Sequence, residues 1–148
     1  MTAKEYLEQV TGIDKRINSL EHRLEILKES ADRITPIYGS ISSGTRKSSD
    51  KLSENIGEKI DIEKEIITLK EEFKAFQIRV EKEIHRIPNN VYATLLAEKY
   101  INGTSWNEIA EIIGYNDVKY VRKILHSKAL AEFERINPPN TRFLPSII

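Results

Sequence analysis

Cationic and amide side chains gather on one face of a predicted helix that runs from Val118 to about Glu134. Lysine and arginine neutralise nucleic-acid phosphates, and asparagine, lysine and tyrosine can reach base edges in the major groove. Acidic residues are few nearby, with Asp117 at the start of the helix. We therefore predict that this helix contacts double-stranded DNA. The candidate DNA-binding residues are Asn116, Lys119, Tyr120, Arg122, Lys123, His126 and Ser127, flanked by Lys128.

A second short helix must hold this face in place, and its sequence is TSWNEIAEIIGY. Ser105 and Glu108 have the spacing of a capping box, in which each side chain accepts from the other's backbone N–H. Ala110 allows close helix crossing and Gly114 allows a turn, which together are typical of a helix-turn-helix. Gly103 is placed for a left-handed cap on the preceding helix. The alternative interpretation of these residues is a structural helical hairpin with an ordinary solvated face.

Two long amphipathic runs precede this motif. Apolar residues recur at steps of three and four from Tyr6 to Ile34, and again from Leu52 to Ile87. The segment 35–49, rich in Ser and Gly, shows no periodicity and predicts a loop. Two helices of similar length joined by a loop form an antiparallel hairpin. Pro88 ends the second run, because the residue before proline is displaced from helical space.

The apolar seams of this hairpin need a helical partner, since a single stripe is not satisfied by an isolated helix. The pattern leaves open whether the hairpin closes within one chain or two chains pair into a bundle. The long seams favour a homodimer, so we predict an oligomerisation role for them. The residues concerned are Val10, Ile13, Ile17, Leu20, Leu24, Leu27, Leu69, Phe73, Phe76 and Val80.

The stretch AEKYINGTSWNEIAEIIGY, with YVRKILHSKAL after it, resembles the C-terminal helix-turn-helix of small regulators from temperate phages of Gram-positive bacteria. The ArpU-like transcriptional regulators belong to this group, and their module is similar to region four of sigma factors. The helical N-terminal half also resembles an uncharacterised phage-protein family. The resemblance implies a framework of Trp106, Ile109, Ala110 and Gly114, and a recognition helix containing Tyr120, Val121, Arg122 and His126. This chain is about one residue longer than the pattern between Gly114 and Val121.

Composition argues against several other classes of protein. The 148 residues contain no Cys, and 23 Lys and Arg balance 23 Asp and Glu. His22, His85 and His126 lie on charged faces without metal-ligand spacing, and no Gly-rich loop could cradle a phosphate. We therefore expect no enzyme activity, cofactor or metal. No apolar run is long enough for a membrane span, so we expect a cytoplasmic protein, in the host cytoplasm if it is phage-encoded.

The sequence as a whole predicts an all-α protein. An antiparallel coiled-coil hairpin over 1–87 mediates self-association, a helix-turn-helix occupies 88–136, and a Pro-rich tail covers 137–148. The predicted function is a sequence-specific, DNA-binding transcriptional regulator of phage type. As a dimer, it would present two recognition helices to successive major grooves, about 34 Å apart.

Two other functions remain open. The first is an interaction module that contacts RNA polymerase or a regulator without reading DNA, and the second, weaker one is a DNA-packaging recognition subunit. We also expect the apolar residues of the tail to dock on the chain itself or on a partner. They are Phe143, Leu144, Ile147 and Ile148.

Overall fold

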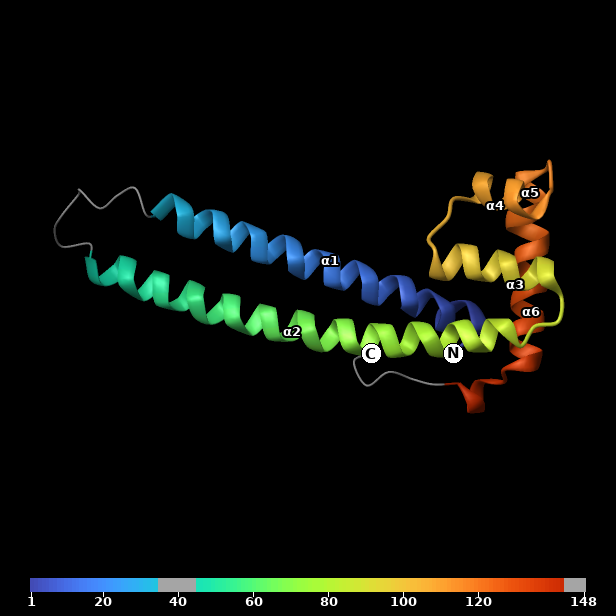
Figure 1. Cartoon of the computed structure of the whole chain (residues 1–148), viewed down its shortest axis with the longest axis horizontal. Helices are drawn as coiled ribbons and strands as arrows, with labels where there is room; N and C mark the ends of the chain where they lie inside the picture. Colours follow the sequence, from blue (N-terminus) through green and yellow to red (C-terminus); the bar gives the residue numbers. More distant parts are fainter. Residues whose placement is uncertain (35–44, 143–148) are drawn as a thin grey trace. The chain divides into compact units, whose positions relative to one another are not determined.

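The structure, a computed structural model, describes residues 1–34 and 45–142, with side chains described for 1–30 and 56–142. This part of the chain is all-α, as predicted, and contains no strand (Figure 1). The α-helices are α1 (Ala3–Ile34), α2 (Thr45–His85), α3 (Asn90–Leu96), α4 (Trp106–Ile113), α5 (Val118–Tyr120) and α6 (His126–Ile136). Two π-helical turns, η2 (Ala97–Ile101) and η3 (Val121–Leu125), continue α3 and α5, and a 3-10 turn, η4 (Pro139–Thr141), follows α6.

The predicted loop and domain boundaries differ from those observed. α2 begins at Thr45, so the expected loop 35–49 is wrong at its C-terminal end. The five residues 45–49 contain no Gly or Pro, and nothing in them opposes a helix. The chain divides into a unit of residues 15–71 and a unit of residues 1–14 with 72–148. The boundary expected between 87 and 88 is therefore not where the units separate.

The unit of residues 15–71 is an antiparallel pair of helical segments from α1 and α2, which lie side by side in Figure 1. Leu27, Ile62 and Ile66 form its buried core, with Leu20 and Leu24 packed against them. Ion pairs join the two helices along both edges of this core. They are Arg16–Glu65 at 2.9 Å, Arg23–Glu58 at 3.1 Å and Lys70–Glu21 at 2.6 Å. Such exposed pairs each contribute about 0–1 kcal/mol, so they select the register more than they stabilise the helices.

Most of the residues predicted to form the oligomerisation seam are covered within the single chain. Seven of the ten residues expected to oligomerise are buried within the single chain: Val10, Ile13, Ile17, Leu27, Leu69, Phe76 and Val80. The other three, Leu20, Leu24 and Phe73, are partly buried. Within the described residues, α1 and α2 therefore pack against each other in one chain, and the predicted association between chains stays a prediction.

The unit of residues 1–14 and 72–148 has one core that includes the ends of both long helices. Tyr6 from α1 packs edge-on against Phe76 from α2, with ring centroids 5.6 Å apart. Its ring also lies 6.1 Å from that of Phe133 in α6. The residues with no measurable exposure in this core are Tyr6, Leu7, Phe76, Val80, Ile84, Leu95, Leu96, Ile109, Val121, Ala129 and Phe133. The helix-turn-helix is thus built onto the ends of α1 and α2.

A buried polar network crosses the same core. Glu83 is 1 % exposed, and its carboxylate accepts from the Tyr6 hydroxyl at 2.8 Å and from Arg79 Nε at 3.3 Å. Asn137 is equally buried, and its Nδ2 donates to the Glu83 carbonyl at 2.9 Å. Arg86 donates to the Asn137 side-chain oxygen at 3.2 Å. These partners satisfy groups whose burial would otherwise be costly, and they join the end of α6 to α2.

The start of the Pro-rich tail packs against the same unit. The Arg142 guanidinium lies 5.4 Å from the centroid of the Tyr6 ring and 5.7 Å from that of Phe133. Its Nη1 donates to the Met1 carbonyl at 3.1 Å. The apolar residues expected to dock, Phe143, Leu144, Ile147 and Ile148, lie outside the described residues.

Replacing either of two glycines of this unit by alanine is expected to change the stability of the protein, in opposite directions. Gly114 caps α4 with φ of 82°, in the left-handed region, so Gly114→Ala is expected to destabilise the protein by about 1–2 kcal/mol. Gly12 lies inside α1, and an added Cβ there meets nothing within 4 Å. We expect Gly12→Ala to stabilise the helix by up to about 1 kcal/mol. Urea denaturation of both variants measures the difference, and equal shifts in one direction would contradict the assignment of a left-handed cap.

Candidate nucleic-acid interface

Three capped helices place the candidate interface. Asn89 caps α3, since its side-chain oxygen accepts from the backbone N–H groups of Val91 and Tyr92. Ser105 caps α4 by accepting from the Glu108 N–H at 3.4 Å, which is half of the predicted capping box. Asp117 caps α5 by accepting from the Tyr120 N–H at 3.2 Å. The three helices therefore begin at capped positions, in the order expected for a helix-turn-helix.

Buried apolar residues hold the last helix against the first two. Ile109 and Ala110 of α4 are buried, and Gly114 turns the chain before α5. Val121, Leu125, Ala129 and Phe133 form the inner edge of the segment 118–136, which we call the recognition helix. The exposed residues of this helix lie on its other sides.

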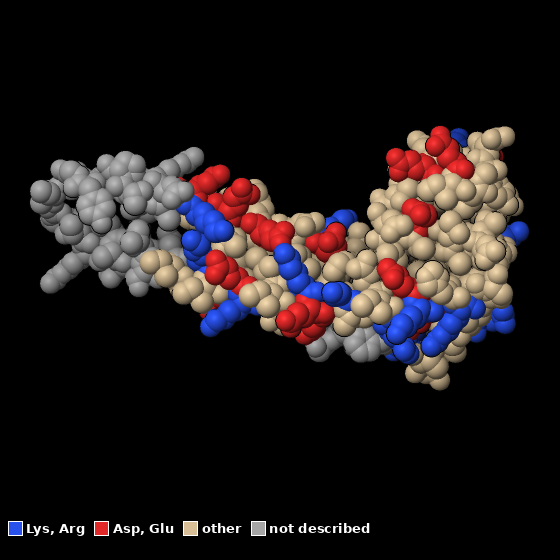
Figure 2. Space-filling model, viewed as in Figure 1, with Lys and Arg blue, Asp and Glu red and all other residues tan. Residues whose placement is uncertain are grey.

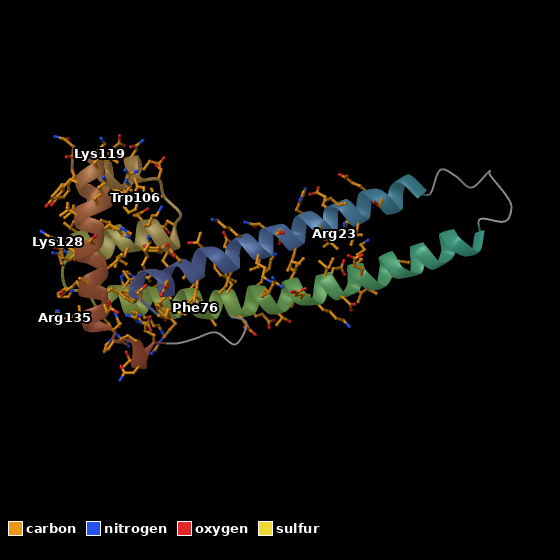
Figure 3. All side chains as sticks on the ribbon, turned by 180° about the vertical axis from the view of Figure 1, so that it is seen from behind. Arg23, Phe76, Trp106, Lys119, Lys128 and Arg135 are labelled. Atoms are coloured by element: carbon orange, nitrogen blue, oxygen red, sulfur yellow. The ribbon has the colours of Figure 1, made fainter. Side chains whose placement is uncertain are left out.

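Four basic residues of the recognition helix are exposed to solvent. They are Lys119, Arg122, Lys123 and Lys128. None of them forms an ion pair with another residue whose side chain the structure describes. Figure 3 places Lys119 at one end of this helix and Lys128 farther along it. From 118 to 130 the sequence contains no acidic residue, so nothing on this stretch offsets its charge.

The polar candidates Asn116, Tyr120 and Ser127 are also exposed. Asn116 lies in the turn before α5. The Tyr120 ring stacks on Tyr115 with centroids 6.1 Å apart, which restrains it at the surface. The Ser127 hydroxyl donates to the Lys123 carbonyl at 2.7 Å, so its remaining capacity is to accept. Six of the seven candidate residues therefore lie on the accessible surface of the recognition helix and its turn.

His126 is the exception and belongs to the internal packing of this unit. Its Nε2 lies 2.7 Å from the Tyr100 hydroxyl, with which it forms a hydrogen bond. The Trp106 ring meets the imidazole edge-on at 5.0 Å, and Lys99 lies over that indole at 4.8 Å. Partial burial, together with the charges of Lys4 and Lys99, lowers the pKa of His126 from 6.5 to about 4. His126 is therefore neutral near pH 7 and is not a phosphate-binding cation.

The same surroundings raise the pKa of the Tyr100 hydroxyl, chiefly by burial and secondarily through the charge of Glu8. Both members of the hydrogen bond are thus held in their uncharged forms. Trp106 is partly buried against the imidazole. Tyr100, Trp106 and His126 together support the N-terminal half of the recognition helix from behind.

The lowered pKa of His126 predicts a pH dependence of stability. The unfolded chain binds a proton near pH 6.5 and the folded one only near pH 4, so stability is lost as pH falls through this window. After allowance for screening of the partly exposed ring, the loss is on the order of 1–2 kcal/mol. Denaturation of wild type and His126→Gln from pH 7 to pH 4 measures it. Carboxylate titration is common to both proteins, so parallel curves would contradict the prediction.

A π-helical turn sets which side of the recognition helix faces outward. The His126 N–H donates to the Val121 carbonyl, one residue farther back than in an α-helix. A π-helical turn holds one more residue than an α-helical turn, so the side chains after it are rotated about the helix axis. Periodicity at 100° per residue did not reveal the turn, and His126 was misplaced for that reason.

The charge on α4 is of the opposite sign. Glu108 and Glu111 are exposed there, and Figure 2 shows acidic side chains gathered at that end of the unit. Ile112 beside them is 54 % exposed. An acidic surface repels phosphates, so α4 does not share the electrostatic character of the recognition helix.

The fold and this surface together define an all-helical protein with a helix-turn-helix whose recognition helix is basic. Comparison of the chain with protein-family models, with curated proteins and with solved structures finds no match. Among the described residues, no three His, Asp or Glu side chains are grouped as metal ligands. Within the same residues, no helix is apolar enough over a sufficient length to cross a bilayer.

Proposed function

We propose that this chain binds double-stranded DNA through its recognition helix and regulates transcription. The observation that carries this proposal is the set of four exposed cations, Lys119, Arg122, Lys123 and Lys128, without an ion-pair partner among the described side chains. A cluster of unpaired like charges does not stabilise a folded protein. It does favour binding to a polyanion, because each phosphate contact releases condensed counterions.

The proposed contacts follow from the position of each side chain. Segment 118–136 is long enough, at roughly 28 Å, to lie in a major groove. Asn116 and Tyr120, at its N-terminal end, are proposed to meet base edges, where an amide can bind adenine through two hydrogen bonds. The lysines and Arg122 are proposed to contact phosphates. His126 is left out of this set, because the Tyr100 hydroxyl and the Trp106 ring already surround it.

The experiment that tests this function is a titration of the full chain into a labelled DNA duplex at several salt concentrations. A slope of about −0.9 per phosphate contact in a plot of log affinity against log salt is expected. With three or four contacts, affinity falls by about 40–150-fold between 50 and 200 mM salt. No binding at the lowest salt would overturn the proposal.

A second candidate function is an interaction module that contacts another protein, and the surface of α4 favours it. Glu108, Glu111 and the exposed Ile112 form an acidic and apolar patch that does not suit DNA. The two functions are separable, because they use different helices. If DNA binding fails in the titration, capture experiments with wild type and an Ile112→Arg variant would test the patch on α4.

A further inference from the structure

Three isoleucines of α2 face solvent on a single stripe. Ile56, Ile60 and Ile67 are 51 %, 46 % and 59 % exposed, all within the unit of residues 15–71. At about 100° per residue they fall within about 40° of one another. The buried residues of α2 in this unit, Ile62, Ile66 and Leu69, are centred about 130° away on the same scale. α2 is therefore apolar on two faces, and α1 covers only one of them.

A second apolar face on a highly charged helix favours binding to a partner, because removing exposed aliphatic side chains from water is favourable. We propose that a second copy of this chain covers Ile60 and Ile67 of this stripe, with the two α2 helices antiparallel. Ile60 then lies opposite the partner's Ile67, and Ile67 lies opposite the partner's Ile60. This contact is distinct from the seam between α1 and α2, which is already filled.

The charged residues between Ile60 and Ile67 favour a second copy of this chain as the partner, and they favour antiparallel helices. Glu63 and Lys64 lie between Ile60 and Ile67, are exposed, and pair with no other described side chain. When Ile60 faces the partner's Ile67, Glu63 faces the partner's Lys64, and two-fold symmetry repeats the pair. A parallel arrangement instead puts Glu63 against Glu63 and Lys64 against Lys64, which is repulsive. The stripe is thus complementary to itself only when it is antiparallel.

The proposed interface is small, so we expect a reversible dimer with a dissociation constant on the order of 10 μM. Sedimentation equilibrium of the full chain measures this constant. Ile60→Glu/Ile67→Glu is expected to weaken dimerisation by about 100-fold or more, because it buries unpaired carboxylates. Ile26→Glu is the matched control, since Ile26 is 39 % exposed on α1 and lies outside the stripe. Circular dichroism confirms that each variant keeps its helices.

A charge exchange tests the direction of pairing. Glu63→Lys alone is expected to weaken the dimer by about tenfold, because it places two lysines opposite each other. Glu63→Lys/Lys64→Glu restores both pairs and is expected to return the constant to within about threefold of wild type. Loss of dimer in the single variant without recovery in the double variant would overturn the antiparallel arrangement.

Cross-linking provides an independent test, because the chain contains no native cysteine. An equimolar mixture of Ile60→Cys and Ile67→Cys proteins is expected to form disulfide-linked dimers on mild oxidation, while each variant alone stays largely unlinked. Efficient self-linking of Ile60→Cys would show parallel helices and overturn the proposal. A monomer at all concentrations would overturn it too. Neither result bears on DNA binding, which the titration measures separately.

Discussion

Reversing the charge of Lys119 and Lys123 together is expected to lower DNA affinity on the order of 100-fold at low salt. Both side chains are exposed on the recognition helix, and neither has an ion-pair partner among the described side chains. The Lys119→Glu/Lys123→Glu variant removes two phosphate contacts and adds two repulsions. The slope of log affinity against log salt should fall by about two in the same titration.

The matched control is Lys15→Glu/Lys28→Glu, which makes the same change in net charge on exposed positions of α1. We expect its affinity at 0.1 M salt to stay within about threefold of wild type, because neither residue belongs to the recognition helix and the effect of overall charge is largely screened at that salt. Equal losses in the two double variants would show that binding depends on total charge rather than on the recognition helix. Both proteins should keep the helical content of wild type.

Replacing Phe133 by alanine is expected to destabilise the protein by about 3–5 kcal/mol. Phe133 has no measurable exposure and packs against Tyr6, and the Arg142 guanidinium lies 5.7 Å from its ring. Truncation leaves a cavity where α6 meets the first turns of α1. Since many domains are stable by only about 5–15 kcal/mol, much of the margin would be lost. Thermal and urea denaturation measure the change.

Ile112→Ala is the control for Phe133→Ala, because Ile112 is 54 % exposed. Its expected effect is within about 0.5 kcal/mol. A loss below about 1 kcal/mol for Phe133→Ala would mean that the ends of α1 and α6 do not share a cooperative core. Deleting residues 1–14 should then also leave the helix-turn-helix folded, whereas the structure predicts that this deletion unfolds it.

The seams of the long helices show what a periodic pattern leaves undecided. Apolar residues at steps of three and four indicate that a helix needs a partner, but they do not identify it. The same stripe serves an intramolecular hairpin and an intermolecular bundle equally well. In the structure, Arg16, Arg23 and Lys70 pair with carboxylates across the hairpin of a single chain, while association between chains stays a prediction.

The division into compact units depends on distant contacts in the same way. Pro88 follows the end of α2, but a helix can end without ending a compact unit. Burial crosses that point, because Tyr6 and Phe76 pack in the same core as Phe133. No local property of the sequence around Pro88 reports a contact with residues so far away in the chain.

The sequence placed His126 on the correct helix but on the wrong side of it. Regular 100° steps set it beside the basic residues, whereas the π turn at Val121–Leu125 and the neighbouring Tyr100 and Trp106 enclose it. Local sequence does not distinguish this turn from an α-helical one, because the backbone angles are nearly the same. The choice depends on how the side chains pack.

The sequence by itself determined the all-α class, the cap at Ser105, the left-handed cap at Gly103 and the turn at Gly114, because each depends on the chemistry of a few neighbouring residues. It also placed the basic residues on the last helix. The tertiary structure alone decided which apolar faces are covered, where the units divide and that His126 turns inward. Those outcomes depend on contacts between residues distant in the chain, and periodicity shows that a face is apolar without showing what covers it.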